Sequence, residues 1–259
     1  MSSADFPRYF EAQYTEYTED LPFWLRLAAE CGGPVLELGC GYGRVLIALA
    51  REGWSVAGLD HDRGMLARAE AHLNEDLRQR TALHHGDITS FSLDRTFALV
   101  ISPCNTFASL DEDAFVLAST CSLRHLDPAG RLVLDLPPTP ASLVPFSGET
   151  ELLAAFLEPE SGNPVQVSAR DAMERSGARY HVTWLYDELL ADGRVARTEI
   201  SMSYHLREPE MLSRLLGKAG YDRTEFYGDY QRNAHSRGST RLIVVASRRA
   251  DEAQRSAAP

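Results

Sequence analysis

The sequence predicts an α/β fold built on a parallel sheet with helices on both faces. Short apolar segments typical of buried strands alternate with segments of helical spacing through the first half of the chain. A glycine-rich loop, GCGYG at residues 39–43, joins the first of these strands to the helix that follows it. Alternation of this kind is typical of parallel sheets covered on both faces. At 259 residues, the chain suits one domain with an insertion better than two separate cores.

Local composition places the individual elements. The expected strands are residues 35–38, 55–60, 83–88, 97–102, 131–136, 224–230 and 240–247. The expected helices are residues 20–31, 44–52, 62–77, 112–124 and 209–220. The first helix has clear ends, because Asp20 can cap it, Pro22 suits its first turn, and Gly32–Gly33–Pro34 stops it. We expect a single domain over the whole chain, with an N-terminal helical cap at 1–31 and a frayed tail at about 248–259.

Between Pro137 and His205 the pattern changes to alternation with a period of two. ARYHVTWLYDELL and VARTEISMSYHL flank Asp192–Gly193, and this arrangement predicts a β-hairpin. An antiparallel β insertion is therefore expected at about residues 140–205, after the fifth strand. Ligands bind outside the carboxyl ends of the strands of open α/β sheets, so such an insertion can roof the site. The alternative is a dimerisation sheet, in which the insertion forms a homodimer.

Composition and charge disfavour several classes of protein. Apolar residues make up 44% and charged residues 24%, and no segment approaches the roughly 20 apolar residues that a membrane helix needs. The net charge of -11 would repel a phosphate backbone, so neither DNA nor RNA is expected as a partner. The N-terminal segment carries no export signal, and a cytoplasmic location is expected. The scattered cysteines are interpreted as reduced thiols, and no metal site is expected.

The spacing of the glycines in the loop decides between two classes of cofactor. A dinucleotide site uses G-x-G-x-x-G, and its third glycine would fall where this chain has Arg44. The spacing therefore disfavours NAD. Asp60 ends the second strand, where a carboxylate can accept two hydrogen bonds from a ribose diol. Together with the glycine loop, Asp60 is expected to bind a ribose.

With Glu37 in the strand before it, the loop VLELGCGYGR resembles the first motif of the class I S-adenosylmethionine (SAM) dependent methyltransferases. The resemblance extends over about residues 9–136 and, more loosely, 206–247. More narrowly, the chain is similar to amino-sugar N,N-dimethyltransferases and glycine/sarcosine-type N-methyltransferases, through YFEAQYTEY, ISPCNTFASL and the insertion. It lacks the NPPY-type motif of DNA or glutamine N-methyltransferases. The resemblance implies a Rossmann-like seven-stranded class I methyltransferase sheet with an antiparallel β insertion after the fifth strand.

The resemblance also implies a set of contacts to SAM. The N-terminal segment folds over the cofactor in the resembled family, so Tyr14 and Tyr17 are expected to lie against SAM. Asp87 is expected to receive the adenine amino group, with Ile88 in apolar contact. The expected cofactor-binding residues are Tyr14, Tyr17, Glu37, Gly39, Cys40, Gly41, Arg44, Asp60, His61, Met65, Gly86, Asp87, Ile88, Ser102 and Pro103.

The sulfonium of SAM carries an activated methyl group, so the enzyme must mainly align a lone pair of the acceptor and exclude water. The candidates for a catalytic role are Tyr14, Asn105, His181 and His235. Flat aromatic walls suit a ring-bearing substrate or a methylammonium-like centre. The expected substrate pocket contains Asn105, Trp184, Tyr186, Tyr204 and Tyr230.

These observations predict transfer of a methyl group from SAM to a nitrogen or oxygen of a small-molecule acceptor, as in specialised metabolism. Two alternatives keep the same SAM site. The first is a cyclase that attacks another carbon on the sulfonium and releases methylthioadenosine. The second is a SAM-binding partner or regulator without catalysis. The cofactor motifs do not separate these hypotheses, and no sequence feature identifies the acceptor.

Overall fold

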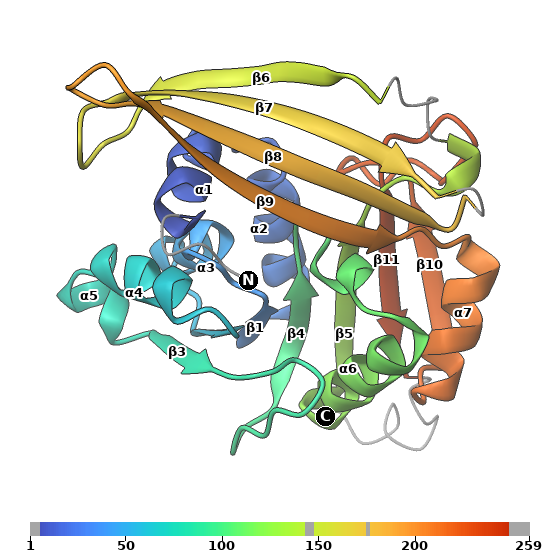
Figure 1. Ribbon diagram of the computed structural model, residues 1–259. Coiled ribbons are helices and arrows are strands. Elements are labelled where there is room, and N and C mark those ends of the chain that lie inside the picture. Colours follow the sequence, from blue (N-terminus) through green and yellow to red (C-terminus); the bar gives the residue numbers. More distant parts are fainter. Residues whose placement is uncertain (1–5, 143–147, 175–176, 249–259) are drawn as a thin grey trace, which may run out of the picture.

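The computed structural model describes residues 6–142, 148–174 and 177–248, and Figure 1 shows their arrangement. A central seven-stranded sheet has the order β10-β11-β5-β4-β1-β2-β3. Its strands are β1 (Val35–Leu38), β2 (Val56–Asp60), β3 (Thr81–His85), β4 (Phe97–Ser102), β5 (Leu126–Leu136), β10 (Arg223–Tyr227) and β11 (Leu242–Ser247). The predicted parallel sheet is confirmed for β1 to β5. The two closing strands complete the predicted seven-stranded sheet, and β11, which returns from β10, is antiparallel to both of its neighbours.

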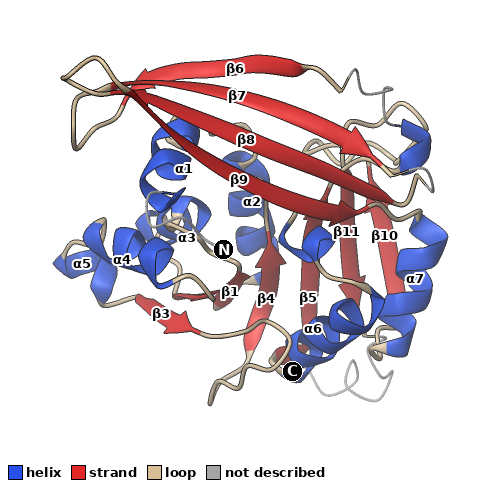
Figure 2. Ribbon diagram, viewed as in Figure 1, coloured by secondary structure: helices blue, strands red, loops and turns tan. Residues whose placement is uncertain are grey.

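Helices cover both faces of this sheet (Figure 2). They are α1 (Phe6–Tyr14), α2 (Leu21–Cys31), α3 (Arg44–Arg51), α4 (Arg63–Ala71), α5 (Glu75–Arg78), α6 (Glu112–Arg124) and α7 (Pro209–Lys218). Successive residues of a strand point to opposite faces, so Leu36 packs with α6 and α7 whereas Val35 packs with α2 and α3. Among the described residues, no helix is long and apolar enough to cross a membrane.

Several of the predicted elements end earlier than expected, among them the strand predicted at residues 224–230, which ends at Tyr227. The single helix predicted at residues 62–77 is wrong, because Asn74 accepts a hydrogen bond from the Leu77 amide and starts the short helix α5. The strand predicted at residues 83–88 begins at Thr81 and ends at His85. It ends there because the Asp87 side chain accepts a hydrogen bond from the amide two residues later and turns the chain.

The insertion forms a second sheet, which is antiparallel and has the order β6-β7-β8-β9. Its strands are β6 (Thr150–Leu157), β7 (Pro164–Met173), β8 (Arg179–Leu189) and β9 (Val195–His205). The hairpin predicted around Asp192–Gly193 is confirmed as β8 and β9, and β6 and β7 extend it. We call these four strands the lid sheet, because they lie across the carboxyl ends of the central strands (Figure 1). Residues 143–147 of the expected insertion, and the expected tail from residue 249, lie outside the described residues.

A buried carboxylate joins helix α1 to the lid sheet. Glu188 of β8 accepts hydrogen bonds from Arg8 at 2.8 Å and from the Tyr9 hydroxyl at 2.6 Å. Ser161 and Asn163, in the turn between β6 and β7, donate to the same carboxylate. Burial acts to raise the pKa of Glu188, but these hydrogen bonds outweigh it and bring the pKa down to about 2. Helix α1 and the lid sheet are therefore one packed unit at neutral pH.

The lowered pKa of Glu188 predicts that this attachment is sensitive to acid. Its stabilising contribution is present above the ordinary pKa of 4.5 and is lost as the pH falls toward 2. Glu188→Gln should lower the free energy of unfolding at pH 7 by about 1–3 kcal/mol and flatten its decline between these two pH values. Urea unfolding over this pH range measures both effects. The exposed Glu210→Gln should change neither, and an unaltered acid profile in Glu188→Gln would contradict the assignment.

Candidate active site

Glycines shape the loop between β1 and α3. Gly39, Gly41 and Gly43 have φ values of 74°, 54° and 87°, which residues with a side chain rarely adopt. A Cβ at Gly39 would lie 2.6 Å from the side chain of Thr106, so the loop packs closely on the segment after β4. At Gly41, no described atom lies within 4 Å of such a Cβ. This open space allows a ligand to approach the loop backbone.

The carboxylate of Asp60, at the end of β2, faces the loop. It accepts hydrogen bonds from the amides of Gly41 at 2.7 Å and Asp62 at 2.8 Å. Asp60 is only 7% exposed, so its position is well fixed. Because a carboxylate has about four acceptor sites, both oxygens keep capacity for further donors such as ribose hydroxyls. The structure thus places Asp60, the residue predicted to bind the ribose, against the glycine loop.

The residues expected to contact adenine follow β3, next to Asp60. Gly86 donates its amide to the Asp60 carbonyl at 3.0 Å, which ties this turn to the end of β2. Asp87 is exposed, and hydrogen bonds from the amide and then the hydroxyl of Thr89 lower its pKa. Ile88 packs against the hydrophobic core. Asp87 and Ile88, the acidic and apolar residues expected to contact adenine, therefore lie next to each other at the end of β3.

Other residues of the expected cofactor set have structural partners. The Ser102 hydroxyl donates to the Leu38 carbonyl at 3.0 Å and links β4 to β1, so its side chain is already used. Cys40, within the glycine loop, is buried, and Met65 packs in the cluster between α1 and the lid sheet. His61 is placed outside, with 87% of its side chain exposed. The side chains of Cys40 and Met65 are therefore buried, whereas that of His61 is open to solvent.

Glu37, in β1, is a buried carboxyl group beside the glycine loop. Burial raises its pKa well above the ordinary value, and the opposing effect of Arg44 is smaller. Its Oε2 atom has no hydrogen-bond partner among the described residues. A buried acceptor of this kind normally has a donor. The ammonium group of SAM is a donor of suitable chemistry, and together with the open space at Gly41 this shows that the site suits SAM.

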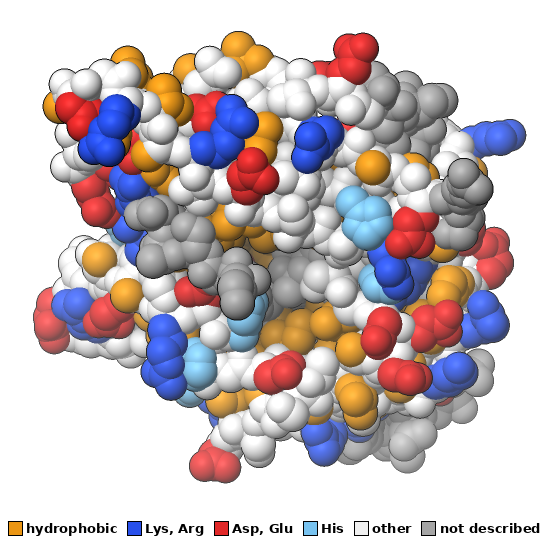
Figure 3. Space-filling model, viewed as in Figure 1, with side chains coloured by type: hydrophobic (Ala, Val, Ile, Leu, Met, Phe, Trp, Pro, Cys, Tyr) orange, Lys and Arg blue, Asp and Glu red, His pale blue; other side chains and the backbone are white. Residues whose placement is uncertain are grey.

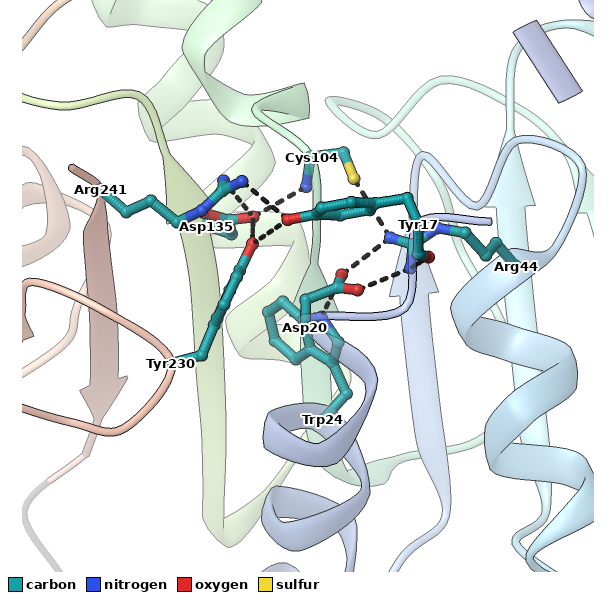
Figure 4. A network of polar contacts seen from close by, with 8 residues as sticks. All are labelled: Tyr17, Asp20, Trp24, Arg44, Cys104, Asp135, Tyr230 and Arg241. Carbon is teal, nitrogen blue, oxygen red and sulfur yellow. Dashed lines mark hydrogen bonds and ion pairs between the residues drawn. The ribbon is translucent and has the colours of Figure 1, made fainter. Parts of the chain in front are cut away.

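Arg44 joins the start of α3 to the N-terminal segment (Figure 4). Its guanidinium group forms a bidentate pair with Asp20, at 2.6 and 2.7 Å, and donates to the Tyr17 carbonyl at 2.9 Å. Asp20 is fully buried and also accepts from the indole of Trp24 at 2.9 Å. The predicted capping role of Asp20 is wrong, because its side chain makes no capping hydrogen bond to α2. Instead, this ion pair anchors the N-terminal segment beside the glycine loop.

Asp135, another buried carboxylate, lies one residue before the end of β5. It accepts hydrogen bonds from Arg241 at 3.2 and 3.3 Å, from the Tyr230 hydroxyl at 3.0 Å and from the Cys104 amide at 3.2 Å. Arg241 also donates to the Tyr17 hydroxyl at 2.8 Å. Burial raises the pKa of Asp135, and Arg241 opposes this effect. Figure 4 shows that Tyr17 lies between this network and that of Arg44.

Sequence reasoning did not identify Asp135 or Arg241 as site residues. A signal for both was present, because Asp135 lies inside the apolar strand segment RLVLDL and Arg241 directly precedes LIVVA. A charged group within a buried strand requires a partner. The partner of each is the other, 106 residues away along the chain.

Aromatic side chains lie between the lid sheet and the N-terminal segment. Tyr14 packs against Phe10 and Tyr17, with ring centroids 4.6 and 6.4 Å apart. Tyr180 and Tyr204 of the lid sheet stack at 6.1 Å. Burial and then the proximity of Tyr14 raise the pKa of Tyr204, and burial also raises that of Tyr14. Figure 3 shows the surface hollowed below the lid sheet, with hydrophobic side chains on its floor.

The remaining residues of the expected substrate pocket lie in two different places. The Tyr230 hydroxyl donates a hydrogen bond to Asp135, and Asn105 directly follows Cys104 in the turn after β4. Trp184 and Tyr186 instead pack the lid sheet onto α1. Tyr186 is fully buried, stacks on Tyr9 at 5.1 Å and donates its hydroxyl to a glutamine of α1. Trp184 and Tyr186 therefore hold the lid sheet in place.

The structure does not bring the candidate His181 to this site. His181 alternates with Tyr180 along β8 and so faces the outer side of the lid sheet, where it contacts the Ser203 hydroxyl at 2.7 Å. His235 lies in the loop between β10 and β11. Among the described residues, its Nε2 atom has no hydrogen-bond partner. Neither imidazole has a described hydrogen bond to Tyr14 or to the buried networks.

Comparisons with known proteins agree with this geometry. The family model described as a methyltransferase domain matches residues 35–130. The cypemycin N-terminal methyltransferase of a Streptomyces species is 27% identical over 221 residues, which are 84% of each chain. The dTDP-3-amino-3,4,6-trideoxy-alpha-D-glucopyranose N,N-dimethyltransferase of Streptomyces venezuelae is 28% identical over 123 residues, 47% of this chain and 50% of that protein. The structure of the sugar N-methyltransferase KedS8 from Streptoalloteichus shares the fold, with a TM-score of 0.76 and 22% identity over 96% of this chain and 93% of that one.

The fold, the glycine loop with Asp60 and these relatives define the class: the chain is a SAM-dependent methyltransferase of class I. Within that class, it is of the type that transfers the methyl group of SAM to a small-molecule acceptor. The expected cofactor, SAM, and the expected enzymatic activity are thereby confirmed.

Proposed function

We propose that the acceptor is an amine, which is methylated on nitrogen in the hollow beneath the lid sheet. The main observation in support is that two buried carboxylates around the hollow are each paired with an arginine. Asp135 is paired with Arg241, Asp20 is paired with Arg44, and the raised pKa values of Tyr14 and Tyr204 keep these phenols protonated. The hollow therefore offers rings and hydroxyl groups rather than a base. A neutral amine needs no base to attack, whereas an alcohol does.

The names of two relatives support nitrogen as the acceptor atom. One relative is an N-terminal methyltransferase, and the other is an N,N-dimethyltransferase of an amino sugar. Aromatic walls also attract the cationic ammonium product by cation–π interaction. We therefore favour a primary or secondary amine on a polar skeleton over a hydroxyl group.

SAM supplies an activated methyl group, and we propose that this chain's residues bind and orient both reactants. The glycine loop and Glu37 would hold the amino-acid end of SAM, Asp60 the ribose, and Asp87 with Ile88 the adenine. Tyr14, Asn105 and Tyr204 would orient the acceptor and exclude water. We propose no catalytic role for His181, because it faces the outer side of the lid sheet.

The test uses pairs of acceptors that differ only in the reacting atom, such as a 3-amino-3-deoxyglucoside and the parent glucoside, or a peptide with an N-terminal amino group and the same peptide with a hydroxyl group in its place. Without a base, we expect the amine of a pair to be methylated at least about 100-fold faster than the matched alcohol. Formation of S-adenosylhomocysteine measures both rates. Equal rates for amine and alcohol would contradict the proposal.

We also propose a homodimer that forms through the edge of the lid sheet. β6 is an edge strand, and three of its leucines are largely exposed: Leu152 at 64%, Leu153 at 50% and Leu157 at 67%. An apolar edge strand is a surface on which another strand can pair. Two copies of β6 in antiparallel orientation would keep their single charged residues, Glu151, apart at opposite ends.

Light scattering after gel filtration tests this dimer. The wild-type protein should elute as a dimer, and Leu153→Lys should shift it to the monomer, because a lysine at the edge opposes pairing. Leu117→Lys, at an equally exposed leucine on α6, should leave the dimer intact. A monomeric wild-type protein would contradict the proposal.

We place the enzyme in the cytoplasm. Cys31, Cys40, Cys104 and Cys121 are all free thiols, which suits a reducing compartment. The exclusion of nucleic acid as a partner stays a prediction from the net charge.

A further inference from the structure

We infer that Asp135 is a positioning residue that holds the Cys104–Asn105 turn in a left-handed conformation at the wall of the acceptor hollow. The inference rests on the proposed function, because it takes this turn to face the reacting groups. Asp135 itself is fully buried and need not touch the acceptor. It would act through the backbone of the turn.

The turn has a backbone conformation that side chains disfavour. Cys104 and Asn105 are successive residues with φ values of 55° and 66°. Among the described residues, the other non-glycine position with positive φ is Arg232, in the loop between β10 and β11. Left-handed non-glycine residues cost free energy and persist only where the surrounding structure fixes them. Two in succession therefore require a specific restraint.

Asp135 supplies that restraint with two different atoms. Its carboxylate accepts a hydrogen bond from the Cys104 amide at 3.2 Å, and its main-chain carbonyl accepts one from the Asn105 amide at 3.0 Å. The N–H and C=O of a trans peptide point in opposite directions. Both bonds therefore turn the adjoining carbonyls of the turn away from β5.

The carboxylate is itself held in place from the opposite side. Arg241 and the Tyr230 hydroxyl donate to it, and Arg241 continues to the Tyr17 hydroxyl. Arg44, the first residue of α3 after the glycine loop, contacts the Cys104 sulfur at 3.4 Å, so the turn is also tied to the end of the loop that we propose for SAM. The turn thus stands where an error in its position would misalign the acceptor with the donor.

Three variants separate positioning from mere stability. Asp135→Asn keeps the shape and the main-chain acceptor but removes the carboxylate. Asp135→Asn with Cys104→Gly adds a residue that adopts positive φ without strain. Tyr221→Phe is the control, because it removes another buried hydrogen bond, from the Tyr221 hydroxyl to the Ser119 carbonyl, far along the chain from the turn.

We expect Asp135→Asn to lower kcat about 100-fold, the usual effect of a misplacement near 1 Å, while the Kd for SAM changes by less than about threefold. The added Cys104→Gly should recover about tenfold of the lost kcat. Tyr221→Phe should lower the melting temperature but keep kcat. An unchanged kcat in Asp135→Asn, or a loss that Cys104→Gly does not recover, would overturn the inference.

A second readout does not depend on the acceptor. The three-bond HN–Hα couplings of Cys104 and Asn105, measured by NMR with SAM alone, report φ directly. They should differ from the wild-type values in Asp135→Asn and stay unchanged in Tyr221→Phe. If the wild-type enzyme methylates no amine, the proposed function fails while these couplings still decide the role of Asp135. Left-handed couplings that persist in Asp135→Asn would overturn that role.

Discussion

Asp60→Ala should weaken the binding of SAM by about 100-fold or more. The Asp60 carboxylate holds the amides of Gly41 and Asp62, so its loss releases the glycine loop, and it also removes the acceptor that we propose for the ribose. A 100-fold change corresponds to about 2.8 kcal/mol. Hydrogen bonds to a charged group contribute about 1.5–3 kcal/mol each, so the loss of two is sufficient. Titration calorimetry with SAM measures the effect.

A matched aspartate distinguishes lost binding from lost stability. Asp111 caps α6 by accepting from the Ala114 amide at 2.9 Å, and Asp111→Ala should cost about 1 kcal/mol of stability without changing SAM affinity. Gly41→Val should act like Asp60→Ala, because its side chain would occupy the open space at a φ of 54°. Wild-type affinity in Asp60→Ala would refute the proposed ribose site.

Arg44→Gln should lower the free energy of unfolding by about 3–5 kcal/mol, the usual cost of leaving one buried charge without its partner. Asp20 is fully buried, and the bidentate pair with Arg44 is its principal compensation beside the indole of Trp24. The variant should also bind SAM weakly, since Arg44 fixes the N-terminal segment against the glycine loop. Urea unfolding and calorimetry measure the two effects.

A double variant tests whether the lost stability comes from the ion pair. Asp20→Asn in the Arg44→Gln background removes the stranded charge and should recover part of the loss. Arg80→Gln breaks an exposed pair with Asp76 and should cost only about 0.5 kcal/mol. If Arg44→Gln were as mild as Arg80→Gln, the N-terminal segment would not be anchored as described.

The features that the sequence predicts well are local ones. The glycine spacing, an acidic residue at the end of β2 and period-two alternation around Asp192–Gly193 each depend on a few neighbouring residues. They suffice for the central sheet, the class of cofactor and the β8–β9 hairpin. The breaks within predicted elements are also local, but Asn74 and Asp87 act there through side-chain hydrogen bonds that periodicity does not reveal.

The features that the sequence does not predict depend on pairs of distant residues. Asp20 is a residue type that commonly caps helices, yet its side chain forms an ion pair with Arg44, 24 residues later. Asp135 and Arg241 meet only because β11 lies beside β5 in the folded sheet. Alternation does place His181 and Tyr180 on opposite faces of one strand, but it does not say which face turns toward the site. Which face turns toward the site is decided by the packing of the lid sheet against α1.

The products formed from SAM distinguish methyl transfer from cyclase chemistry. The protein is incubated with SAM carrying a deuterated methyl group, with and without an amine acceptor, and the products are identified by mass spectrometry. We expect S-adenosylhomocysteine only when the acceptor is present, in equal amount to an acceptor that has gained the labelled methyl group. Methylthioadenosine formed without an acceptor would contradict methyl transfer and support cyclase chemistry at the same SAM site.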